Sequence, residues 1–419
     1  MQIKTKNLLA LSTGTFLEYF DLMIYVHMAA VLNEVFFMKS VNNYAWYTAF
    51  AFCSTFLLKP FGGLFFGYLG DRYGRKSVLI STTTLMAICC MVLSITPSYE
   101  EIGFTAAIIV TICRLLQGLS SIGESTSSEI YMAEQTQKPE RYYYTGIVAY
   151  AGVVGTVAAL VVAKIILALG INWRFVFFAG AVIGFIGFYI RVQLHESFDF
   201  QQTKKKIQSL GKNAAYAKSL LEQKTSCYNI FAYFCVFCGW PICFYFSYVH
   251  CGNILKEKFD FTKEAIIHQN LLLGICNLCG LYFWIHLTKF IHPIKILLAK
   301  TFVFVPLMFF IPTIIDTATS NYDIFFLQVM FIVFGHSTIP AKGVFLMYFP
   351  TLSRFTWAAF LNGLSHVLLY IITSFGLVYL IKEYSNKGIL LIFIPITIIF
   401  IGGVLFFRKK EIEQGYYNQ

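Results

Sequence analysis

The sequence predicts an all-α membrane protein with about twelve transmembrane helices in two bundles of six. Of its 419 residues, 58% are hydrophobic and 13% are charged, whereas soluble domains carry roughly 25% charged residues. Apolar runs of about 20 residues, the length that crosses a bilayer as a helix, recur along the chain. One long polar stretch, His195 to Thr225, separates them into two equal groups.

Each expected span is an apolar run bounded by charged or turn residues. The first group covers 8–36, 46–69, 77–96, 104–132, 142–168 and 174–192, and the second covers 227–252, 265–288, 293–313, 321–347, 355–381 and 386–407. Pro340 and Pro350 interrupt the tenth span and its exit, because proline lacks the N–H that continues a helix. We therefore expect a first bundle at 1–194, a linker at 195–225 and a second bundle at 226–419.

The net charge of +11 is compatible with nucleic-acid binding, but membrane topology explains it better. The basic residues are spread over short loops, and they are most frequent on the side that holds both termini and the linker, including Lys204, Lys205 and Lys206. Because basic loops stay inside the cell, we expect both termini in the cytoplasm. We expect a monomer and no nucleic-acid partner.

A dense charged turn from Gly67 to Lys76 lies between the second and third spans. Asp71 is suited to cap or brace the end of a neighbouring helix, while Arg72 and Arg75 hold the turn on the cytoplasmic side. Gly74 permits a close approach of two backbones. The pattern is typical of a membrane protein whose parts move against one another.

Ionisable side chains at membrane depth cost at least about 2.5 kcal/mol each, so they indicate a site. Glu18 and Asp21 share one face of the first span, about 15 Å from its start. Arg114 in the fourth span and Lys59 in the second reach a similar depth. We expect these four groups to converge on a central cavity. Glu124 lies about 15 Å beyond Arg114, nearer the cytoplasmic end.

Two interpretations of these charges are open. In the first they form a proton and solute site, in which a conformational change separates an acid from its basic partner and the acid takes up a proton. Arg114 or Lys59 then holds a solute carboxylate, and Tyr25 lines the cavity. In the second they are a static ion-pair network that fixes helix packing. His336 is either a proton relay or a hydrogen-bonded core residue.

The chain contains two Cys-x-x-Cys pairs, Cys235 with Cys238 and Cys276 with Cys279. In a soluble protein they would indicate zinc. Here both pairs lie inside apolar spans without a polar shell, which favours small buried core residues. We expect no metal, no cofactor and no structural disulfide. The chain also lacks a nucleophile–base pair and a phosphate-binding Gly-x-x-x-x-Gly-Lys loop, so we do not expect an enzyme.

The charged turn and the fourth span make the chain resemble the major facilitator superfamily. The turn from Gly67 to Lys76 matches that family's signature between spans two and three, and Arg114-Leu115-Leu116-Gln117-Gly118 is similar to its Arg-x-x-Gln-Gly signature. More specifically, it resembles the metabolite:proton symporter branch, which includes proline/betaine, α-ketoglutarate, citrate and shikimate carriers. That likeness rests on the segments 14–21, 59–63 and 347–354.

The resemblance implies the major facilitator fold and rocker-switch alternating access, with proton-coupled uptake of a small organic solute across a bacterial inner membrane. It makes Glu18, Asp21 and Glu124 the candidates for proton coupling. The candidates for solute binding are Arg114, Lys59, Tyr25 and Gln117, and the gating loop contains Asp71, Arg72, Gly74 and Arg75.

Two departures from the branch leave the solute open. Lys59 stands where an arginine is usual, and the loop at 287–293 has lost the signature that a duplicated second half would carry there. We expect symport of a dicarboxylate, proline or betaine. The alternatives are uptake of a sugar or phosphorylated metabolite, and a transporter-like sensor that no longer transports.

Overall fold

The computed structural model describes residues 5–36, 56–170, 172–209 and 225–417. Within these ranges the regular elements are α-helices with short 3-10 and π segments, and none is a strand. The predicted all-α class is therefore confirmed. Part of the predicted second span, 46–55, lies outside the described residues.

The first half contains one long helix for each predicted span. These helices are α1 (Thr5–Phe36), α3 (Lys59–Tyr73), α4 (Arg75–Ile95), α6 (Phe104–Gln135), α7 (Glu140–Leu169) and α8 (Arg174–Val192). A one-turn helix, α5 (Tyr99–Ile102), connects α4 to α6 and begins with a capping box formed by Ser98 and Glu101. The predicted boundaries of these spans lie within a few residues of the observed ones, apart from the earlier start of α1 and the unplaced start of the second span.

The second half has more interrupted spans. The seventh span is a succession of α11 (Cys227–Phe237), α12 (Gly239–Phe244), the π-helix η1 (Tyr245–His250) and α13 (Cys251–Phe259). It is followed by α14 (Lys263–Leu287) and by α15 (Pro293–Phe309) with α16 (Ile311–Thr317), which meet at a 48° bend.

The tenth predicted span is broken where Pro340 was expected to interrupt it. It consists of α17 (Asn321–Phe334), the 3-10 turn η2 (Ile339–Ala341), α18 (Lys342–Phe345) and the 3-10 turn η3 (Leu346–Tyr348). The last two spans are α19 (Arg354–Ile371), continued by η4 (Ile372–Gly376) and α20 (Leu377–Tyr384), and α21 (Gly388–Glu413), which follows the turn η5 (Ser385–Lys387).

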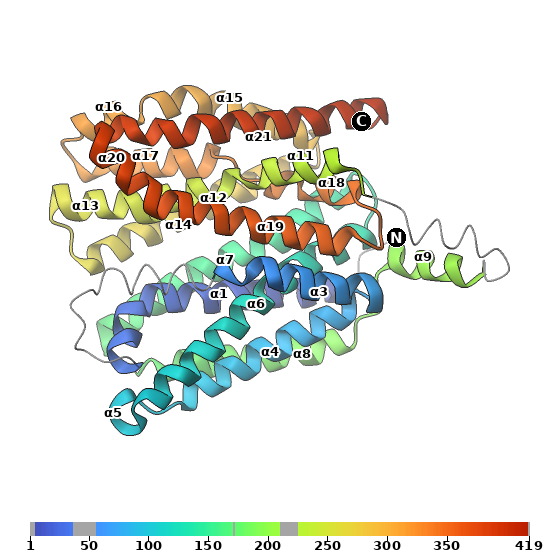
Figure 1. Cartoon of the computed structure of the whole chain (residues 1–419), viewed down its shortest axis with the longest axis horizontal. Helices are drawn as coiled ribbons and strands as arrows, with labels where there is room; N and C mark the ends of the chain where they lie inside the picture. The colour runs from blue at the N-terminus through green and yellow to red at the C-terminus, as the bar shows by residue number, and fades with distance from the viewer. Residues whose placement is uncertain (1–4, 37–55, 171, 210–224, 418–419) are drawn as a thin grey trace.

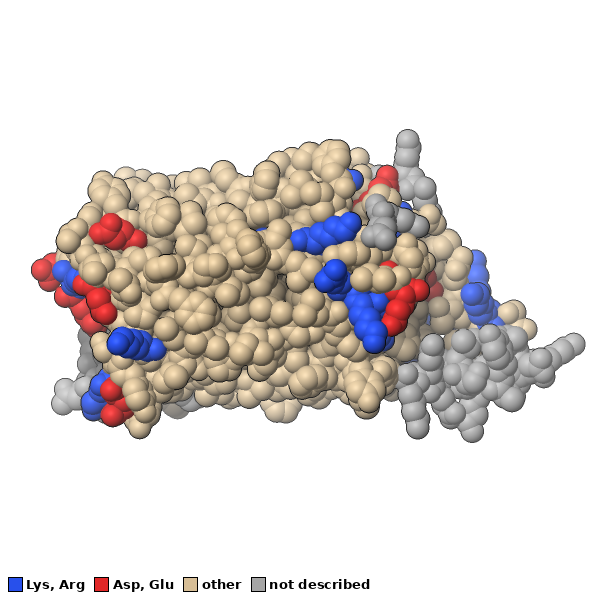
Figure 2. Space-filling view, turned by 90° about the horizontal axis from the view of Figure 1, so that it is seen from above, with Lys and Arg blue, Asp and Glu red and all other residues tan. Residues whose placement is uncertain are grey.

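By length and composition, eight stretches of the described chain can cross a membrane, or nine with the bent pair α15–α16. One of them, 354–413, contains two of the predicted spans, and α1 and α3 account for the first two. The chain is therefore a multi-pass membrane protein with about twelve helices. In Figure 2 the middle of the visible face is almost uncharged, and charged residues gather towards its ends, as a surface in contact with lipid requires.

Helices of the first half and of the second half lie on opposite sides in Figure 1. The helix α9 (Phe198–Ser209), which lies within the predicted linker, projects from one end of the molecule. The carboxyl end of α21 lies at that same end, and α5 and α13 lie at the other. We call the first of these the α9 end. The division at residues 194/195 and 225/226 stays a prediction.

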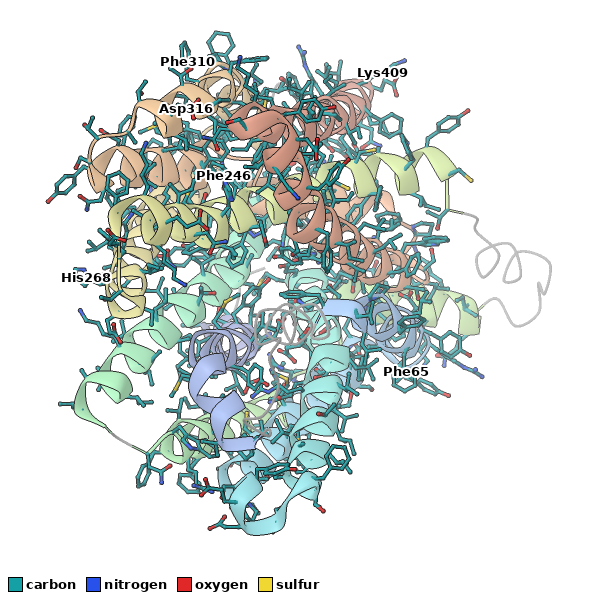
Figure 3. All side chains as sticks on the ribbon, turned by 60° about the vertical axis from the view of Figure 1, so that its left-hand side comes forward. Phe65, Phe246, His268, Phe310, Asp316 and Lys409 are labelled. Atoms are coloured by element: carbon teal, nitrogen blue, oxygen red, sulfur yellow. The ribbon has the colours of Figure 1, made fainter. Side chains whose placement is uncertain are left out.

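Large apolar side chains occupy both the interior and the outer surface. Phe246 is 1% exposed inside the second half, whereas Phe65 and Phe310 are more than half exposed on the periphery (Figure 3). An outer surface of this kind is stable only against lipid.

The two halves meet most closely along α3 and α19. A Cβ atom added to Gly63 would lie 2.7 Å from the carbonyl group of Ala359, and one added to Gly67 would lie 2.5 Å from Cα of Thr356. From the other side, a Cβ on Gly363 would lie 2.8 Å from the backbone of Lys59. Glycines on both helices thus let the two backbones touch.

We predict that Gly63→Val destabilises this arrangement by about 1–3 kcal/mol, because the added side chain has no space beside Ala359. The matched control is Gly402→Val in α21, where an added Cβ meets nothing within 4 Å. Thermal unfolding of the two purified variants measures the difference. Equal unfolding midpoints for both variants would show that the α3–α19 contact does not need glycine.

Candidate functional site

Asp21 and Arg114 form a buried ion pair inside the first half. Arg114 Nη1 lies 3.3 Å from Asp21 Oδ2, and the thiol of Cys90 donates to Asp21 Oδ1 at 3.3 Å. The guanidinium group lies 4.0 Å from the ring centroid of Tyr25 and 5.4 Å from that of Phe177. The pair therefore joins α1 to α6 against an aromatic wall, a contact that favours arginine over lysine.

Arg114 retains hydrogen-bonding capacity. Its Nε and Nη2 atoms are buried and have no partner in the described part of the chain. The nearby Gln117 donates from Nε2 to Cys90 Sγ at 3.6 Å, while its Oε1 is likewise unpaired. Buried N–H groups without acceptors are costly, so this cluster fits a group that brings acceptors with it.

Glu18 lies on the same helix as Asp21 but has different surroundings. Its side chain is 2% exposed, and Oε2 has no hydrogen-bond partner among the described residues. Lys59 is the strongest electrostatic neighbour of Glu18, yet no ion pair joins them. Lys59 is itself buried, and its ammonium group lies 4.9 Å from the ring centroid of Phe56.

A second ion pair near Glu18 connects the two halves of the molecule. Lys342 Nζ in α18 lies 2.5 Å from Glu129 Oε1 in α6, and both side chains are largely buried. Both residues also interact electrostatically with Glu18. The sequence indicated Lys342 only as a lysine within the broken tenth span, so its partner was not predicted.

The four charges expected to converge have two different sets of partners. Asp21 and Arg114 pair within the first half, whereas Glu18 and Lys59 belong to a separate group with Glu129 and Lys342. Sharing one helix face at a spacing of three residues did not bring Glu18 and Asp21 to the same partners. The roles predicted for these residues stay predictions.

Glu124 is held in a third buried pair. Its Oε1 lies 2.5 Å from Arg191 Nη2 in α8, and its Oε2 accepts hydrogen bonds from Thr82 at 2.7 Å and Thr83 at 3.1 Å. Arg191 also donates to the carbonyl of Ala10 at 3.1 Å. Arg191 stands at the end of the sixth predicted span, and its side chain is completely buried. These contacts are those of a structural pair, and proton coupling by Glu124 stays a prediction.

His336 is packed as a core side chain. Its ring lies 4.4 Å from that of Phe304 and 4.3 Å from that of Phe400, measured between centroids. Its Nε2 lies 2.9 Å from the hydroxyl of Thr397. A relay role for His336 stays a prediction.

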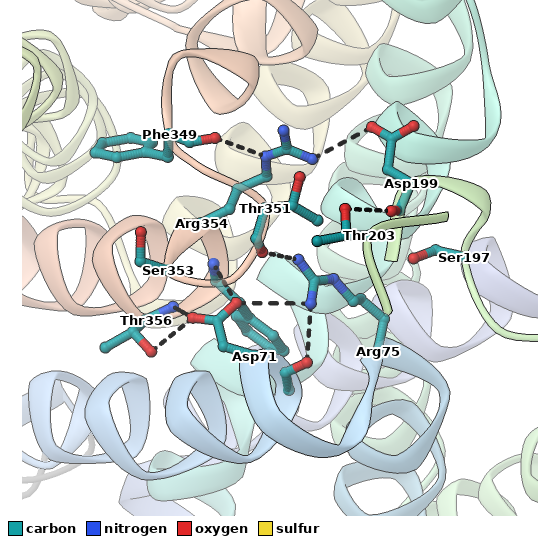
Figure 4. A network of polar contacts seen from close by, with 12 residues as sticks. Asp71, Arg75, Ser197, Asp199, Thr203, Phe349, Thr351, Ser353, Arg354 and Thr356 are labelled. Atoms are coloured by element: carbon teal, nitrogen blue, oxygen red, sulfur yellow. Dashed lines mark hydrogen bonds and ion pairs between the residues drawn. The ribbon is translucent and has the colours of Figure 1, made fainter. Parts of the chain in front are cut away.

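The charged turn lies at the α9 end, where Asp71 caps α19 of the other half (Figure 4). Its carboxylate accepts hydrogen bonds from the backbone N–H of Phe355 at 3.1 Å and from that of Thr356 at 2.8 Å. A carboxylate satisfies these otherwise unpaired amides and complements the positive end of the helix dipole. Gly74 has φ +110°, a conformation that strains any other residue. Arg72 lies outside this contact, with its guanidinium beside the rings of Tyr68 and Tyr73.

Arg75 extends the same contact. It donates to Glu134 at 2.8 Å and to the carbonyl of Thr351 at 2.6 Å. Glu134 also accepts from Arg354 at 2.7 Å, so one buried carboxylate holds an arginine from each half. Arg354 reaches Asp199 of α9 at 3.5 Å; burial raises the pKa of the Asp199 carboxyl, and Arg354 opposes that rise. The sequence did not predict this four-residue network, although all its members lie in or next to charged turns.

A further contact between the halves involves the end of α21. Glu411 is 1% exposed and lies 3.1 Å from Lys138, which precedes α7. It also accepts from the hydroxyl of Tyr348 at 2.7 Å and lies 3.1 Å from His292 Nε2. His292 occupies the loop that lost the expected signature. The α9 end is therefore closed by two polar clusters, one around Glu134 and one around Glu411.

We predict that Asp71→Asn loosens the start of α19 by about 1 kcal/mol, since an amide replaces the capping carboxylate. Hydrogen exchange of the amides of Phe355 and Thr356 is then about five times faster. The control is Glu101→Gln, which alters the capping box of α5 at the opposite end. Unchanged exchange in Asp71→Asn would mean that the cap does not stabilise this closure.

Of the cysteine pairs, only one is fully buried. Cys235 and Cys238 are 3% and 4% exposed, whereas Cys276 is half-buried and Cys279 is exposed. The expectation that both pairs are core residues is wrong for Cys279, which faces outward from α14. Among the described residues no group of three or more His, Cys, Asp or Glu is arranged to hold a metal ion.

The model of the Major Facilitator Superfamily matches residues 11–341 of the chain, which is more than half of it. The chain belongs to this superfamily. Membership confirms the predicted fold and shows that the protein is not an enzyme.

The proline/betaine transporter of Escherichia coli K12 is 37% identical over 213 residues, which is 48% of this chain and 42% of that protein. The glycine betaine/proline/ectoine/pipecolic acid transporter of Dickeya dadantii is 35% identical over 213 residues, which again is 48% of this chain and 42% of that protein. The matched segment spans less than half of each relative.

Among solved structures, the proton:xylose symporter XylE bound to 6-bromo-6-deoxy-D-glucose superposes with a TM-score of 0.76 at 16% identity, covering 97% of this chain and 95% of that one. The inward-open XylE from E. coli gives a TM-score of 0.60, also at 16% identity, over 96% and 95% of the two chains. At this identity the likeness concerns the fold alone.

Proposed function

We propose that the protein is a proton-coupled symporter of a small organic carboxylate or zwitterion, of the dicarboxylate, proline or betaine type. The proposal rests on two buried groups in the first half that have no hydrogen-bond partner among the described residues. They are the Nε and Nη2 donors of Arg114 and the carboxylate oxygen Oε2 of Glu18. Sequence likeness to carriers named for proline and betaine supports this solute class.

Arg114 is the proposed contact for the solute carboxylate. Its free Nε and Nη2 atoms belong to one planar guanidinium edge, which matches the two oxygens of a carboxylate. Asp21 and Tyr25 hold the group in place from other sides. Gln117 supplies an unpaired oxygen beside it, and Lys59 supplies a second buried cation.

Glu18 is the proposed proton carrier. A buried carboxylate with an unpaired oxygen is favoured as the neutral acid unless a cation remains close. Lys342 interacts with Glu18 from the other half of the molecule. When the halves separate around this site, Lys342 moves away and Lys59 alone stays beside Glu18, which favours uptake of a proton. When the halves close again, the return of Lys342 favours its release.

Rocking of the two halves accounts for alternating access. The clusters around Glu134 and Glu411 close the α9 end. With both termini and the linker in the cytoplasm of a bacterium, this end faces inward. The gate then opens by release of Arg75 and Arg354 from Glu134. The protein acts as a monomer in the inner membrane.

Uptake into proteoliposomes tests the proposal. Purified protein is supplied with radiolabelled proline, glycine betaine, α-ketoglutarate or xylose, with and without an imposed proton gradient. We expect gradient-driven accumulation of at least one of the first three and none of the sugar. Arg114→Met is expected to lose this uptake, while Arg174→Met, at the opposite end, retains it. Accumulation of xylose alone would contradict the solute class, and binding without accumulation would favour a sensor.

A further inference from the structure

The interior of the second half contains a cation without a counter-charge. Lys300 in α15 is 2% exposed, and its ammonium group lies 5.8 Å from the ring centroid of Trp284. In the described parts of the chain, Lys300 takes part in no ion pair and no hydrogen bond. A buried ammonium group without acceptors costs several kcal/mol.

A second donor without an acceptor lies near Lys300, because the His336 ring packs at 4.4 Å against Phe304, which is one helical turn from Lys300 on α15. The His336 ring and the Thr397 hydroxyl share a hydrogen bond of 2.9 Å, and the other neighbour of that hydroxyl is Met308 Sδ at 3.6 Å. The hydroxyl proton goes to the nearer and better acceptor, which is Nε2 of the ring. Nδ1 then carries the ring proton, and Nδ1 is buried without a partner among the described residues.

The donor on His336 lies where the backbone leaves the helix. His336 lies in the non-helical segment between the end of α17 at Phe334 and the start of η2 at Ile339. Broken helices inside transporters are kept where they line an ion or ligand site. The thiol of Cys243, which lies close to Lys300, adds no negative charge while it is protonated.

Two buried ion pairs provide the contrast. Arg191 in the first half lies 2.5 Å from Glu124, and Lys342 in the second half lies 2.5 Å from Glu129. The described residues supply no such carboxylate to Lys300.

We propose that Lys300 and the Nδ1–H group of His336 bind a compact monovalent anion inside the second half, either a halide or a small carboxylate. The ammonium supplies the charge, and the two donors together replace part of the anion's hydration shell. Aromatic rings on both sides of His336 limit the space, so a large organic anion is excluded. This site is separate from the one proposed for the transported solute.

Thermal unfolding in three salts tests the proposal. Purified protein is heated in sodium chloride, sodium formate or sodium gluconate at equal ionic strength. We expect the wild-type midpoint to be higher by several degrees in chloride, in formate or in both than in gluconate, because a bound anion stabilises the folded state. A rise in chloride alone identifies a halide site, and a rise in formate alone identifies a carboxylate site.

Lys300→Met provides the decisive comparison. Its midpoint is expected to be equal in all three salts and to exceed that of the wild type in gluconate, because an uncompensated buried charge is removed. The control is Lys295→Met, an exposed lysine on the same helix, which should keep the wild-type salt dependence. A wild-type midpoint that is the same in all three salts, or a salt dependence that survives in Lys300→Met, overturns the proposal.

A measurement on the wild type alone guards against misfolding of the variant. Where chloride raises the midpoint, crystals grown in sodium bromide are expected to show an anomalous peak within hydrogen-bonding distance of Lys300 Nζ. Absence of that peak, together with equal midpoints in the three salts, would mean that Lys300 is held as a neutral amine.

Discussion

Glu18→Gln is expected to abolish accumulation of solute against its gradient while leaving exchange of solute across the membrane intact. Glutamine keeps the size and the hydrogen-bonding atoms of the protonated acid, but it cannot release a proton. The variant is therefore fixed in the proton-loaded form, which binds and exchanges solute without drawing on the proton gradient. For one proton per solute, a gradient of one pH unit supports about tenfold accumulation, which falls to none in the variant.

Paired assays in proteoliposomes separate these two activities. Counterflow of labelled solute measures exchange, and uptake driven by an imposed pH gradient measures coupling. The matched control is Glu140→Gln, an exposed glutamate at the start of α7, which should behave as wild type in both assays. If Glu18→Gln still accumulates solute, Glu18 is not the proton carrier, and Asp21 becomes the next candidate.

Arg191→Met is expected to have the largest effect on stability. It leaves Glu124 buried at 1% exposure without its cation, and truncation of one partner of such a pair costs about 3–5 kcal/mol. Thr82 and Thr83 still donate to the carboxylate, so part of its hydrogen bonding persists. We expect a much lower unfolding midpoint and poor yield from membranes.

The double variant Glu124→Gln/Arg191→Met distinguishes lost pairing from lost packing. Removing both charges should recover a large part of the stability, because no uncompensated ion remains. Arg174→Met on the same helix serves as the control, since its guanidinium binds only the carbonyl of Thr96 and the face of Trp173 among the described residues. A double variant no more stable than Arg191→Met would show that the arginine acts through its packing.

The fold was predictable from the sequence because the bilayer imposes a simple rule on length and polarity. Apolar runs located the helices, and Pro340 located the break in the tenth span. The pairing of Arg191 with Glu124 was not predictable, because Arg191 stands at the end of an apolar run, where a side chain that faces a loop and one that turns into the bundle have the same sequence signature. The structure shows that it reaches inward to the backbone of Ala10.

The sequence identified the residues of the candidate site one by one, but it did not predict the contacts between them. The cost of a buried charge identified Glu18, Asp21, Arg114 and Lys59, but not how they pair. Glu129 and Lys342 are 213 positions apart in the chain, and nothing in the local pattern of either residue indicates the other. The same holds for Glu134, whose two arginines come from separate halves of the molecule.

Proton exchange with the medium during solute binding tests the central claim most directly. Purified carrier in weakly buffered detergent solution is mixed with a saturating amount of the solute that it accumulates, and the pH change is recorded. We predict uptake of about one proton per carrier by the wild type and none by Glu18→Gln, since solute and proton bind together. An unchanged pH with the wild type, or the same proton uptake by both proteins, would contradict the assignment of Glu18.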